Sequence, residues 1–470
     1  MVLHGVPTTV PRLLADRALS EPDREALVVD GVGALTFGEW QRRASGLAGR
    51  LHEDGVGPGD RVGLRFGAAE WLGYAVAYVA VQRLGAVAVP IAADAAPAEV
   101  EHVLADCGAV RLLQEGAEEA STETPADRSA PNGLAQILYT SGTTARPKGV
   151  AASHANVTFG AGARHRPFRH SRHLLHAFAI GTNAAQVMLM NALLAHPAVV
   201  TLPVFTPLRF ARAIKHYAAG TVFVVPAMAM ELLAVADGID LGCVRLLGSA
   251  AAPLPGPVAA RLASALPNAT IVNYYTSTEA APAQTAMAYD PERPGSVGRP
   301  IAGGGVRVLD DGGRACDPGE VGAVWMHSPA PARSYLHDSA SATFRDGWVR
   351  MGDAGYVDGD GYLYLVERDS DVVKTGAHRV STLQVEAAIH EHPAIADAAV
   401  VGVPHEVLGV ELAAVIVVRG DAPLSPPALR AFLAERLAPH EIPARVHAVD
   451  QLPRNRGGKV DKRSLRRSLT

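Results

Sequence analysis

The sequence predicts an α/β protein with a large N-terminal domain of layered α/β subdomains and a small C-terminal α+β domain. Three observations support this prediction. The chain has 470 residues, 48% of them hydrophobic, which is too long for one ordinary core and predicts two or three packed units. Strand and helix patterns alternate over most of the length. From Gly352 onward the pattern changes to a short run of strands and helices.

The first elements follow from local signals. Thr36 with Glu39 three residues later is typical of a capped helix start, and apolar residues then recur at helical spacing through Leu51. Alternation of such helices with strands indicates parallel α/β layers. Short strand-like runs predict buried strands at 61–64, 86–90, 134–138 and 222–226.

Two stretches of the large domain carry no regular pattern. Residues 114–133 are rich in Glu, Ser, Thr, Pro and Ala, and predict a mobile surface loop. Residues 160–176 contain several arginines and four histidines. A metal site is one interpretation, but no ligand spacing or carboxylate partner is present, so a cationic surface loop is favoured. The histidines are His165, His170, His173 and His176.

The C-terminal part begins with a turn at 358–361, followed by a strand at 362–366. We place the domain boundary near Ser370, which gives a large domain of residues 1–369 and a small domain of residues 370–470. The small domain is predicted to contain a helix at 383–390, strands at 398–403 and 413–418, and a helix at 427–437.

Composition restricts the functional class. The formal net charge is −4, from 43 basic and 47 acidic residues, so there is no electrostatic case for a nucleic-acid partner. Basic residues do cluster from Arg454 to Arg467; a polybasic tail is possible, but a solvated last helix is favoured. We expect Cys107, Cys243 and Cys316 to be small buried hydrophobes in a reduced compartment. Neither a signal peptide nor a membrane-spanning apolar run is evident, so a cytoplasmic protein is expected.

Residues 139–150 are the most informative stretch, reading Tyr-Thr-Ser-Gly-Thr-Thr-Ala-Arg-Pro-Lys-Gly-Val. Such a loop can wrap phosphates with backbone N–H groups, hydroxyls and one cation, and it lacks the ending of a Walker A loop. It resembles the phosphate loop of the adenylate-forming enzymes, which include acyl-CoA synthetases, adenylation domains of peptide synthetases and luciferases. The resemblance implies an ATP-binding set of Thr140, Ser141, Gly142, Thr143, Thr144 and Lys148.

A second motif at 273–279 resembles the family's aromatic–x–x–Thr–Glu segment. There Tyr275 would face adenine, Thr278 would bond the α-phosphate and Glu279 would hold Mg²⁺. The family usually has glycine where Thr276 stands, so the floor of the acyl pocket is expected to differ. The alternative interpretation is a strand followed by a helix cap, which Thr278 and Glu279 would also serve.

Further residues resemble nucleotide contacts of the family. Gly248, Ser249 and Ala250 match a small-residue turn whose backbone lies along the adenine, although any strand-to-helix turn could look similar. Asp353, in an element resembling Thr-Gly-Asp, would accept both ribose hydroxyls. Arg368, in an element resembling Gly-Arg-x-x-Asp, would also reach the ribose.

The resemblance also implies that the small domain is mobile. Ser370 falls on the hinge residue, where Asp or Lys is usual, and Glu367 replaces a glycine. Gly376 matches the glycine that lines the thiol tunnel after the domain rotates. Lys459 matches the lysine carried on a C-terminal glycine loop, where it would bridge the substrate carboxylate and the α-phosphate.

The resemblance covers essentially the whole chain and implies a two-step acid–thiol ligase. A carboxylate first attacks the α-phosphate of ATP and releases pyrophosphate, a step that needs charge neutralisation and positioning. A thiol then attacks the acyl-adenylate. The implied catalytic residues are Lys148, Thr278, Glu279 and Lys459.

The acceptor is open at this stage. CoA, the phosphopantetheine of a carrier protein acting in trans, and an amine that would give an amide are the three options. A binding protein that holds nucleotide without turnover is the alternative from a different functional class.

The acyl pocket points to a small or medium acid. Gly181 stands where an aspartate would anchor an α-amino group, which argues against an ordinary α-amino acid. Polar neighbours suggest a hydroxyl, amino or keto group on a possibly aromatic acid, and the Ala-, Arg- and Pro-rich texture suggests specialised metabolism in a GC-rich bacterium. The pocket is expected to include Phe178, Ile180, Gly181, Thr182, Asn183, Gly248, Tyr275, Thr276 and Ser277.

Overall fold

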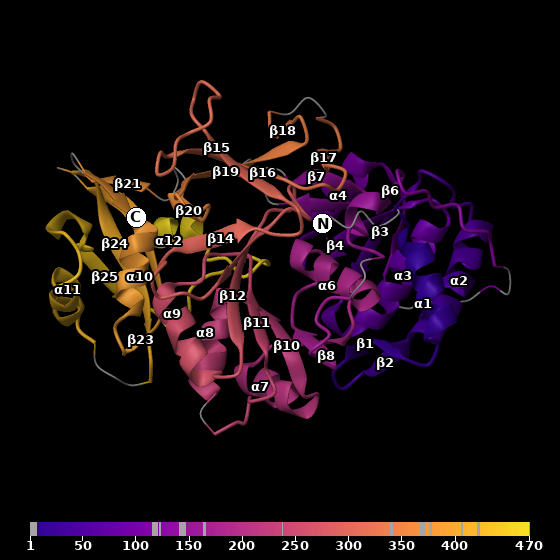
Figure 1. Ribbon diagram of the computed structural model, residues 1–470, viewed down its shortest axis with the longest axis horizontal. Helices are drawn as coiled ribbons and strands as arrows, with labels where there is room; N and C mark the ends of the chain where they lie inside the picture. The colour runs from indigo at the N-terminus through magenta and orange to yellow at the C-terminus, as the bar shows by residue number, and fades with distance from the viewer. Residues whose placement is uncertain are drawn as a thin grey trace.

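The computed structural model is a mixed α/β protein with a large N-terminal part and a small C-terminal part, which confirms the expected fold class. In Figure 1 the chain runs from indigo helices at the right, through magenta strands in the middle, to the yellow small part at the left. The residues that the structure describes are 7–114, 121, 124–140, 147–162, 166–236, 238–338, 342–366, 372–375, 378–405, 408–420 and 424–469. The domain boundary at Ser370 lies outside them and stays a prediction.

The largest sheet has 14 strands within the described residues and runs through the whole large part. In spatial order its strands are β15 (Gly305–Leu309), β16 (Gly322–His327), β19 (Trp348–Val357), β20 (Leu363–Val366), β14 (Ser296–Pro300), β13 (Thr285–Ala288), β12 (Thr270–Tyr275), β11 (Leu246–Ser249), β10 (Ala219–Val224), β8 (His173–His176), β9 (Ala198–Thr201), β1 (Glu25–Val29) and β2 (Gly33–Thr36), with β18 (Phe344–Arg345) beside β19.

The middle of this sheet is parallel. Strands β12, β11, β10, β8, β9 and β1 all run in one direction, and Ser249 on β11 is in register with both Val224 and Asn273. Their carboxyl ends therefore meet along one edge, the edge at which α/β sheets bind ligands.

A second sheet lies in the N-terminal part. Its outer strand β17 comes from much later in the chain, so the sheet joins segments that are far apart in sequence. In spatial order its strands are β17 (Ser334–Tyr335), β7 (Lys148–Ser153), β6 (Leu134–Thr140), β4 (Val87–Ala92), β3 (Arg61–Phe66) and β5 (Ala109–Leu113).

Helix α3 (Trp71–Arg83) lies between the two sheets and packs against β3 and β4 on one side and β1 on the other. Its Trp71, Tyr74 and Tyr78 are fully buried, so the largest core of the molecule is built around this helix. The other helices of the large part are α1 (Val10–Ser20), α2 (Phe37–Glu53), α4 (Pro97–Cys107), α5 (His154–Val157), α6 (Asn183–Leu194), α7 (Pro207–His216), α8 (Pro226–Val235) and α9 (Gly256–Ala265), with the 3₁₀ turn η1 (Ala68–Glu70).

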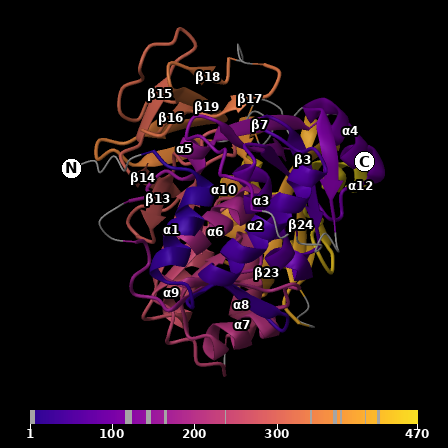
Figure 2. The ribbon, with the colours of Figure 1, turned by 90° about the vertical axis from the view of Figure 1, so that its right-hand side faces the viewer.

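Figures 1 and 2 both show β15, β16, β18 and β19 as an upper layer, with α7 at the opposite end of the molecule. The small part has hydrophobic clusters of its own, one of which runs from Val373 to Leu437. Its elements are β21 (Val372–Thr375), β22 (His378–Ser381), α10 (Thr382–His390), β23 (Ile395–His405), β24 (Gly409–Val418), α11 (Pro426–Ala434), η2 (Pro439–Glu441), β25 (Arg445–Ala448) and α12 (Lys462–Leu469).

Most predicted elements are confirmed. The Thr36 hydroxyl caps α2 by accepting from the Glu39 N–H at 3.2 Å. The strand predicted at 222–226 is displaced: β10 ends at Val224, because Pro226 is the first residue of α8. The helix predicted at 427–437 ends earlier, at Ala434. In the 114–133 stretch, the described residues form neither helix nor strand.

The cationic-loop interpretation of 160–176 is wrong at its end. His173 and His176 lie on β8, a central parallel strand, and both are buried. Burial lowers the pKa of His176 to about 3, so this imidazole is neutral. His165 lies outside the described residues, within which no group of three or more His, Cys, Asp or Glu could hold a metal ion.

The expectation for the cysteines holds only for Cys107, which is buried and reduced. Cys243 and Cys316 are also free thiols but are half-buried. The basic C-terminal stretch includes α12, which buries Leu465 against the small part while Arg463, Arg466 and Arg467 are exposed, as a solvated last helix would be. None of the helices in the described part of the chain has the length and apolar character needed to span a bilayer.

Candidate active site

Three of the predicted motifs meet at the carboxyl edge of the large sheet. Residues 178–183 follow β8, Gly248 and Ser249 end β11, and the segment 275–279 continues from β12. Since β8, β10, β11 and β12 are neighbouring parallel strands, segments up to about a hundred positions apart in the chain gather at one place. This is the edge where the fold is expected to bind its substrates.

The predicted phosphate loop falls in the sequence between two antiparallel strands, β6 and β7. Thr140 at the end of β6 is the direct cross-strand partner of Lys148 at the start of β7. The Lys148 ammonium lies 4.9 Å from the centre of the Tyr335 ring, within range of a cation–π contact. Ser141, Gly142, Thr143 and Thr144 lie outside the described residues.

Tyr335 also links this hairpin to the second motif. Its hydroxyl donates to Glu279 Oε1 at 3.2 Å, while within the described residues no donor reaches the other oxygen of that carboxylate. Thr278 and Glu279 lie in a turn between β12 and β13 rather than at a helix start, so the helix-cap alternative is wrong. Lys148, Tyr335 and Glu279 therefore form one chain of contacts across the two sheets.

The two residues predicted to contact adenine and ribose are also brought together. The Tyr275 hydroxyl at the end of β12 donates to Asp353 Oδ2 on β19 at 2.6 Å. Both side chains are half-buried. A short hydrogen bond to a carboxylate fixes the ring and the acid relative to each other, as a preformed nucleotide site requires.

The small-residue turn after β11 has a packing role of its own. A Cβ on Gly248 would lie 2.6 Å from the Phe223 ring and 2.9 Å from the Tyr274 ring, so only glycine fits there. Next to it, the buried Ser249 Oγ has no hydrogen-bond partner among the residues that the structure describes, and neither has Oδ1 of its register partner Asn273. Ala250 is half-buried and follows directly.

The predicted acyl pocket is partly apolar. Phe178 and Ile180 are buried, and the Phe178 ring stacks on His176 at 5.4 Å. Gly181 has φ +95°, and a Cβ there would lie 2.9 Å from the Ala92 backbone nitrogen. No other residue is accommodated at this position without strain, so an anchoring aspartate could not stand here.

Four polar residues expected in this pocket use their side chains within the protein. Thr182 caps α6 through the Ala185 N–H, and the Thr276 hydroxyl donates to the Ala283 carbonyl at 2.7 Å. Ser277 Oγ accepts from the Ala280 N–H at 3.1 Å, and Asn183 Oδ1 accepts from Arg333. The hydroxyl of Thr276 thus closes the turn that carries Thr278 and Glu279.

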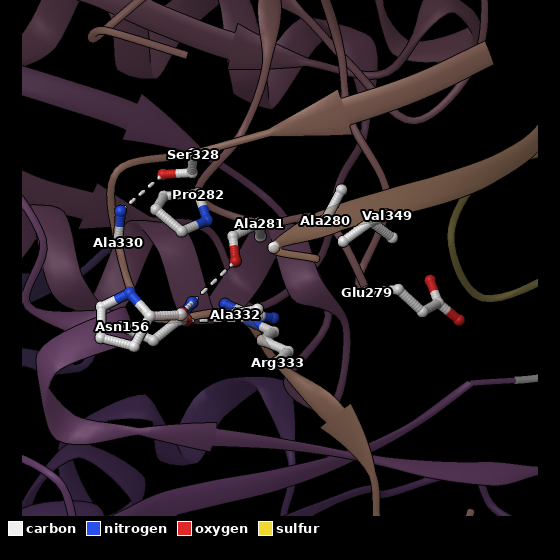
Figure 3. Close-up of a pocket in the computed structure, with 12 residues that line it drawn as sticks. Asn156, Glu279, Ala280, Ala281, Pro282, Ser328, Ala330, Ala332, Arg333 and Val349 are labelled. Carbon is white, nitrogen blue, oxygen red and sulfur yellow. Dashed lines mark hydrogen bonds between the residues drawn. The ribbon is translucent and has the colours of Figure 1, made fainter. Parts of the chain in front are cut away.

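Arg333 is a site residue that the sequence did not reveal. Its guanidinium is 7% exposed and donates to Asn156 Oδ1 at 2.9 Å, to Asn183 Oδ1 at 3.1 Å and to the Thr278 carbonyl at 2.8 Å. Figure 3 shows it beside Asn156, with the Glu279 carboxylate pointing away from both. Arg333, Asn156 and Glu279 line a cavity of about 10 Å³, which is enough for about one water molecule. Burial lowers the pKa of Arg333 to about 10.

Asn156 completes this cluster from α5. Its side-chain amide donates to the Ala281 carbonyl at 3.0 Å and to the Pro331 carbonyl at 2.8 Å. These partners are more than a hundred residues away in sequence, and no local pattern marks either Asn156 or Arg333. Only the folded topology brings them to the turn that carries Thr278.

The lysine loop is a closed turn. The Asn455 N–H donates to the Lys459 carbonyl at 2.8 Å, and the Lys459 N–H donates back to Asn455 Oδ1 at 3.1 Å. Lys459 is exposed, and Gly458 beside it approaches Val225 at the end of β10 so closely that a Cβ would lie 2.8 Å from that side chain. The loop thus reaches the carboxyl edge of the large sheet, and Figure 1 shows a yellow segment extending from the small part toward the middle.

Three predicted residues of the ribose, hinge and tunnel elements lie outside the described residues: Arg368, Ser370 and Gly376. Their neighbours are described. β20 ends at Val366, before Arg368 and Ser370, and Gly376 falls in the sequence between β21, which ends at Thr375, and β22, which begins at His378.

Comparison with known proteins agrees with this geometry. A family model described as AMP-binding enzyme matches residues 14–336, and a second one, described as AMP-binding enzyme C-terminal domain, matches residues 384–459. A feruloyl-CoA synthase from Amycolatopsis sp is 31% identical over 96% of this chain and 97% of its own length.

Two further proteins are similar over nearly their full lengths. A 2-succinylbenzoate–CoA ligase from Bacillus licheniformis is 31% identical over 97% of this chain and 99% of its own. The o-succinylbenzoate CoA synthetase of Bacillus subtilis, solved with an acyl-adenylate intermediate, has a TM-score of 0.84 at 26% identity and covers 97% of this chain and 98% of its own.

Proposed function

The chain belongs to the AMP-binding enzyme family, and from this membership we propose that it joins a small or medium-sized aromatic carboxylic acid to CoA through an acyl-adenylate. Members of this family bind ATP, and the chain is an enzyme of the acid–thiol ligase kind. The contact chain Lys148–Tyr335–Glu279 carries the proposal, because it joins the phosphate hairpin to the end of β12 in a single site.

In the first step the substrate carboxylate attacks the α-phosphate of ATP, forming the P–O bond of the acyl-adenylate as the bond to pyrophosphate breaks. Lys148 and the loop after Thr140 would hold the β- and γ-phosphates, with Thr278 on the α-phosphate. Lys459 would offset the charge on the α-phosphate and the carboxylate. Tyr275 and Asp353, joined by their hydrogen bond, would hold adenine and ribose.

Glu279 is suited to a magnesium ion. Mg²⁺ is usually held by one or two carboxylates together with substrate phosphates. Glu279 is half-buried beside the phosphate hairpin, and only one of its two oxygens accepts a hydrogen bond from the described residues. A bound Mg²⁺ would supply charge neutralisation for the phosphates.

An aromatic acid fits the residues around the pocket. Phe178 and Ile180 offer an apolar wall, and position 181 has no place for a side chain that would pair with an α-ammonium group. The two relatives compared above are named for a feruloyl and a 2-succinylbenzoate group, both of which contain an aromatic ring. These observations together favour an aromatic acid without an α-amino group.

In the second step the thiol sulfur attacks the acyl carbonyl, and AMP leaves. We propose that the small domain, residues 370–470, turns about Ser370 relative to the large domain, residues 1–369, and brings Gly376 to the thiol tunnel. CoA is the proposed acceptor, and a carrier protein or an amine remains the alternative. We expect the enzyme in the cytoplasm, where ATP and CoA are available.

The test is pyrophosphate release with ATP and Mg²⁺ against a panel of aromatic and aliphatic acids, each with and without CoA. Acid-dependent release, with a CoA thioester as product, is the expected result. Adenylate formation that CoA does not turn over would replace CoA by a carrier protein or an amine. ATP binding without release for any acid would overturn the proposal in favour of a binding protein.

A further inference from the structure

Arg456 connects the lysine loop to the large part of the molecule. Its Nε lies 2.8 Å from Asp94 Oδ1, its Nη1 lies 2.6 Å from Glu99 Oε1, and its Nη2 donates to the Asp94 carbonyl at 3.2 Å. Asp94 precedes α4 and Glu99 lies in the first turn of that helix. Arg456, three positions before Lys459, thus binds the start of α4 through its guanidinium.

The other half of α4 contacts the ends of the phosphate loop. The His102 Nε2 lies 3.3 Å from the Pro147 carbonyl oxygen, next to Lys148. The Tyr139 hydroxyl, just before the loop, donates to Asp106 Oδ2 at 2.6 Å. Helix α4 therefore bridges the two loops that carry Lys148 and Lys459.

The loop transmits this contact to Lys459. The mutual hydrogen bonds between Asn455 and Lys459 close the turn, and the Gly458 N–H donates to the Asn455 carbonyl at 2.9 Å. Because Arg456 sits inside this closed turn, holding its guanidinium on α4 also fixes where the backbone of Lys459 lies. Val225 against Gly458 is a second contact, but an apolar one without directionality.

We call the ion pairs of Arg456 with Asp94 and Glu99 the clasp. Its strength suits a contact that must form and break. The side chains of Arg456, Glu99 and Asp94 are 35%, 33% and 72% exposed. Ion pairs at such exposure are weak and screened by salt, whereas the forked geometry of arginine adds direction.

We propose that Arg456 is a positioning residue that docks the lysine loop on α4 for adenylate formation and releases it for thiol transfer. This inference rests on the proposed function. It assigns the segment from Asp94 to Glu99 as the docking platform for the small domain in the first step only.

The experiment measures the two half-reactions separately for Arg456→Ala. Acid- and ATP-dependent pyrophosphate formation is expected to fall about tenfold, as for the loss of a partly exposed, forked ion pair. Transfer from supplied acyl-adenylate to CoA should stay unchanged. Arg463→Ala, which removes an exposed arginine of α12, is the matched control and should alter neither step. Equal losses in both steps, or no loss in the first, would overturn the proposal.

A double-mutant cycle tests the platform. Asp94→Asn with Glu99→Gln should reproduce the loss in the first step, and adding Arg456→Ala should give no further loss. Losses that multiply would show that Arg456 acts elsewhere. In the wild type the first step should slow as salt rises, and this dependence should weaken in Arg456→Ala.

Docking can also be measured without turnover. Spin labels at Leu19→Cys on α1 and Ala428→Cys on α11, with Cys243 and Cys316 replaced by serine, would report the distance between the two parts with ATP present. A broader distance distribution in Arg456→Ala supports the clasp, and an unchanged one refutes it. Lack of pyrophosphate release by the wild type would refute only the proposed function.

Discussion

Replacing Arg333 with methionine tests whether a buried guanidinium organises the site. Methionine is unbranched and uncharged, so it replaces the apolar stem of the arginine side chain while removing every donor. Three acceptors lose their hydrogen bonds: the side-chain oxygens of Asn156 and Asn183, and the Thr278 carbonyl. Two of these three acceptors belong to residues predicted to bind the acid or the nucleotide.

The magnitude follows from two opposing terms. An unsatisfied buried acceptor costs about 1–3 kcal/mol, which applies in full to the buried Asn156, whereas the half-buried acceptors of Asn183 and Thr278 cost about 1 kcal/mol each, so the three together cost about 4 kcal/mol. Against this, burial lowers the pKa of Arg333 from 12.5 to about 10. This shift corresponds to a desolvation cost of about 3 kcal/mol for the charged guanidinium, which is absent when methionine stands in its place. The net expectation is a loss of about 1 kcal/mol in the free energy of unfolding.

The assay compares urea unfolding and steady-state kinetics of Arg333→Met with those of the wild type. The KM for both the acid and ATP should rise, because Asn183 and the Thr278 carbonyl lose their common donor. Arg345→Met, at a side chain that is 72% exposed on β18, is the control and should change stability by less than about 0.5 kcal/mol. An Arg333→Met protein with wild-type stability and KM would refute the reasoning.

Three further predictions address the lysine, the pocket and the buried histidines. Lys459→Ala should abolish acid-dependent pyrophosphate release but preserve thiol transfer from supplied acyl-adenylate; an unaffected first step would remove Lys459 from the mechanism. Gly181→Asp should bind no α-amino acid and should lower the melting temperature, because φ +95° and the 2.9 Å approach to the Ala92 nitrogen leave no room for a side chain; productive activation of an amino acid would contradict this. Burial lowers the pKa of His390 to about 4, below its unfolded value of 6.5, so the unfolded state takes up a proton first as the pH falls. Stability should therefore drop between pH 6.5 and 4, by about 2 kcal/mol at pH 5 for this residue, and His390→Gln should flatten that part of the unfolding profile.

Local signals in the sequence predicted much of the fold. The cap at Thr36 and the turn after Asp358 are short-range features, and both have the expected hydrogen bonds. The end of β10 was misplaced by two residues because an apolar run continues through Val225 into α8. The strand containing His173 and His176 was missed because buried histidines do not match the apolar pattern of a core strand, and the stretch around them is cationic.

The candidate site was predicted as a set of separate motifs rather than as a connected structure. Tyr275 and Asp353 were each singled out, but their hydrogen bond depends on β12 and β19 meeting in the fold. Arg333 and Tyr335 were missed because they lie just before and on β17, a short strand that pairs with β7 from far along the chain. Contacts of this kind depend on topology, which no local pattern contains.

The lysine loop is anchored within the small part at both ends. Arg454 pairs with Asp397 on β23 at one end, and at the other Lys462 bonds Glu386 at 2.9 Å while Leu465 packs in the core. Lys459 therefore lies on a segment that is fixed to the small part at both ends. In the proposed rotation Lys459 would be withdrawn together with this whole segment, so the contacts that would have to break are those with the large part, among them Arg456 on α4 and Gly458 on Val225.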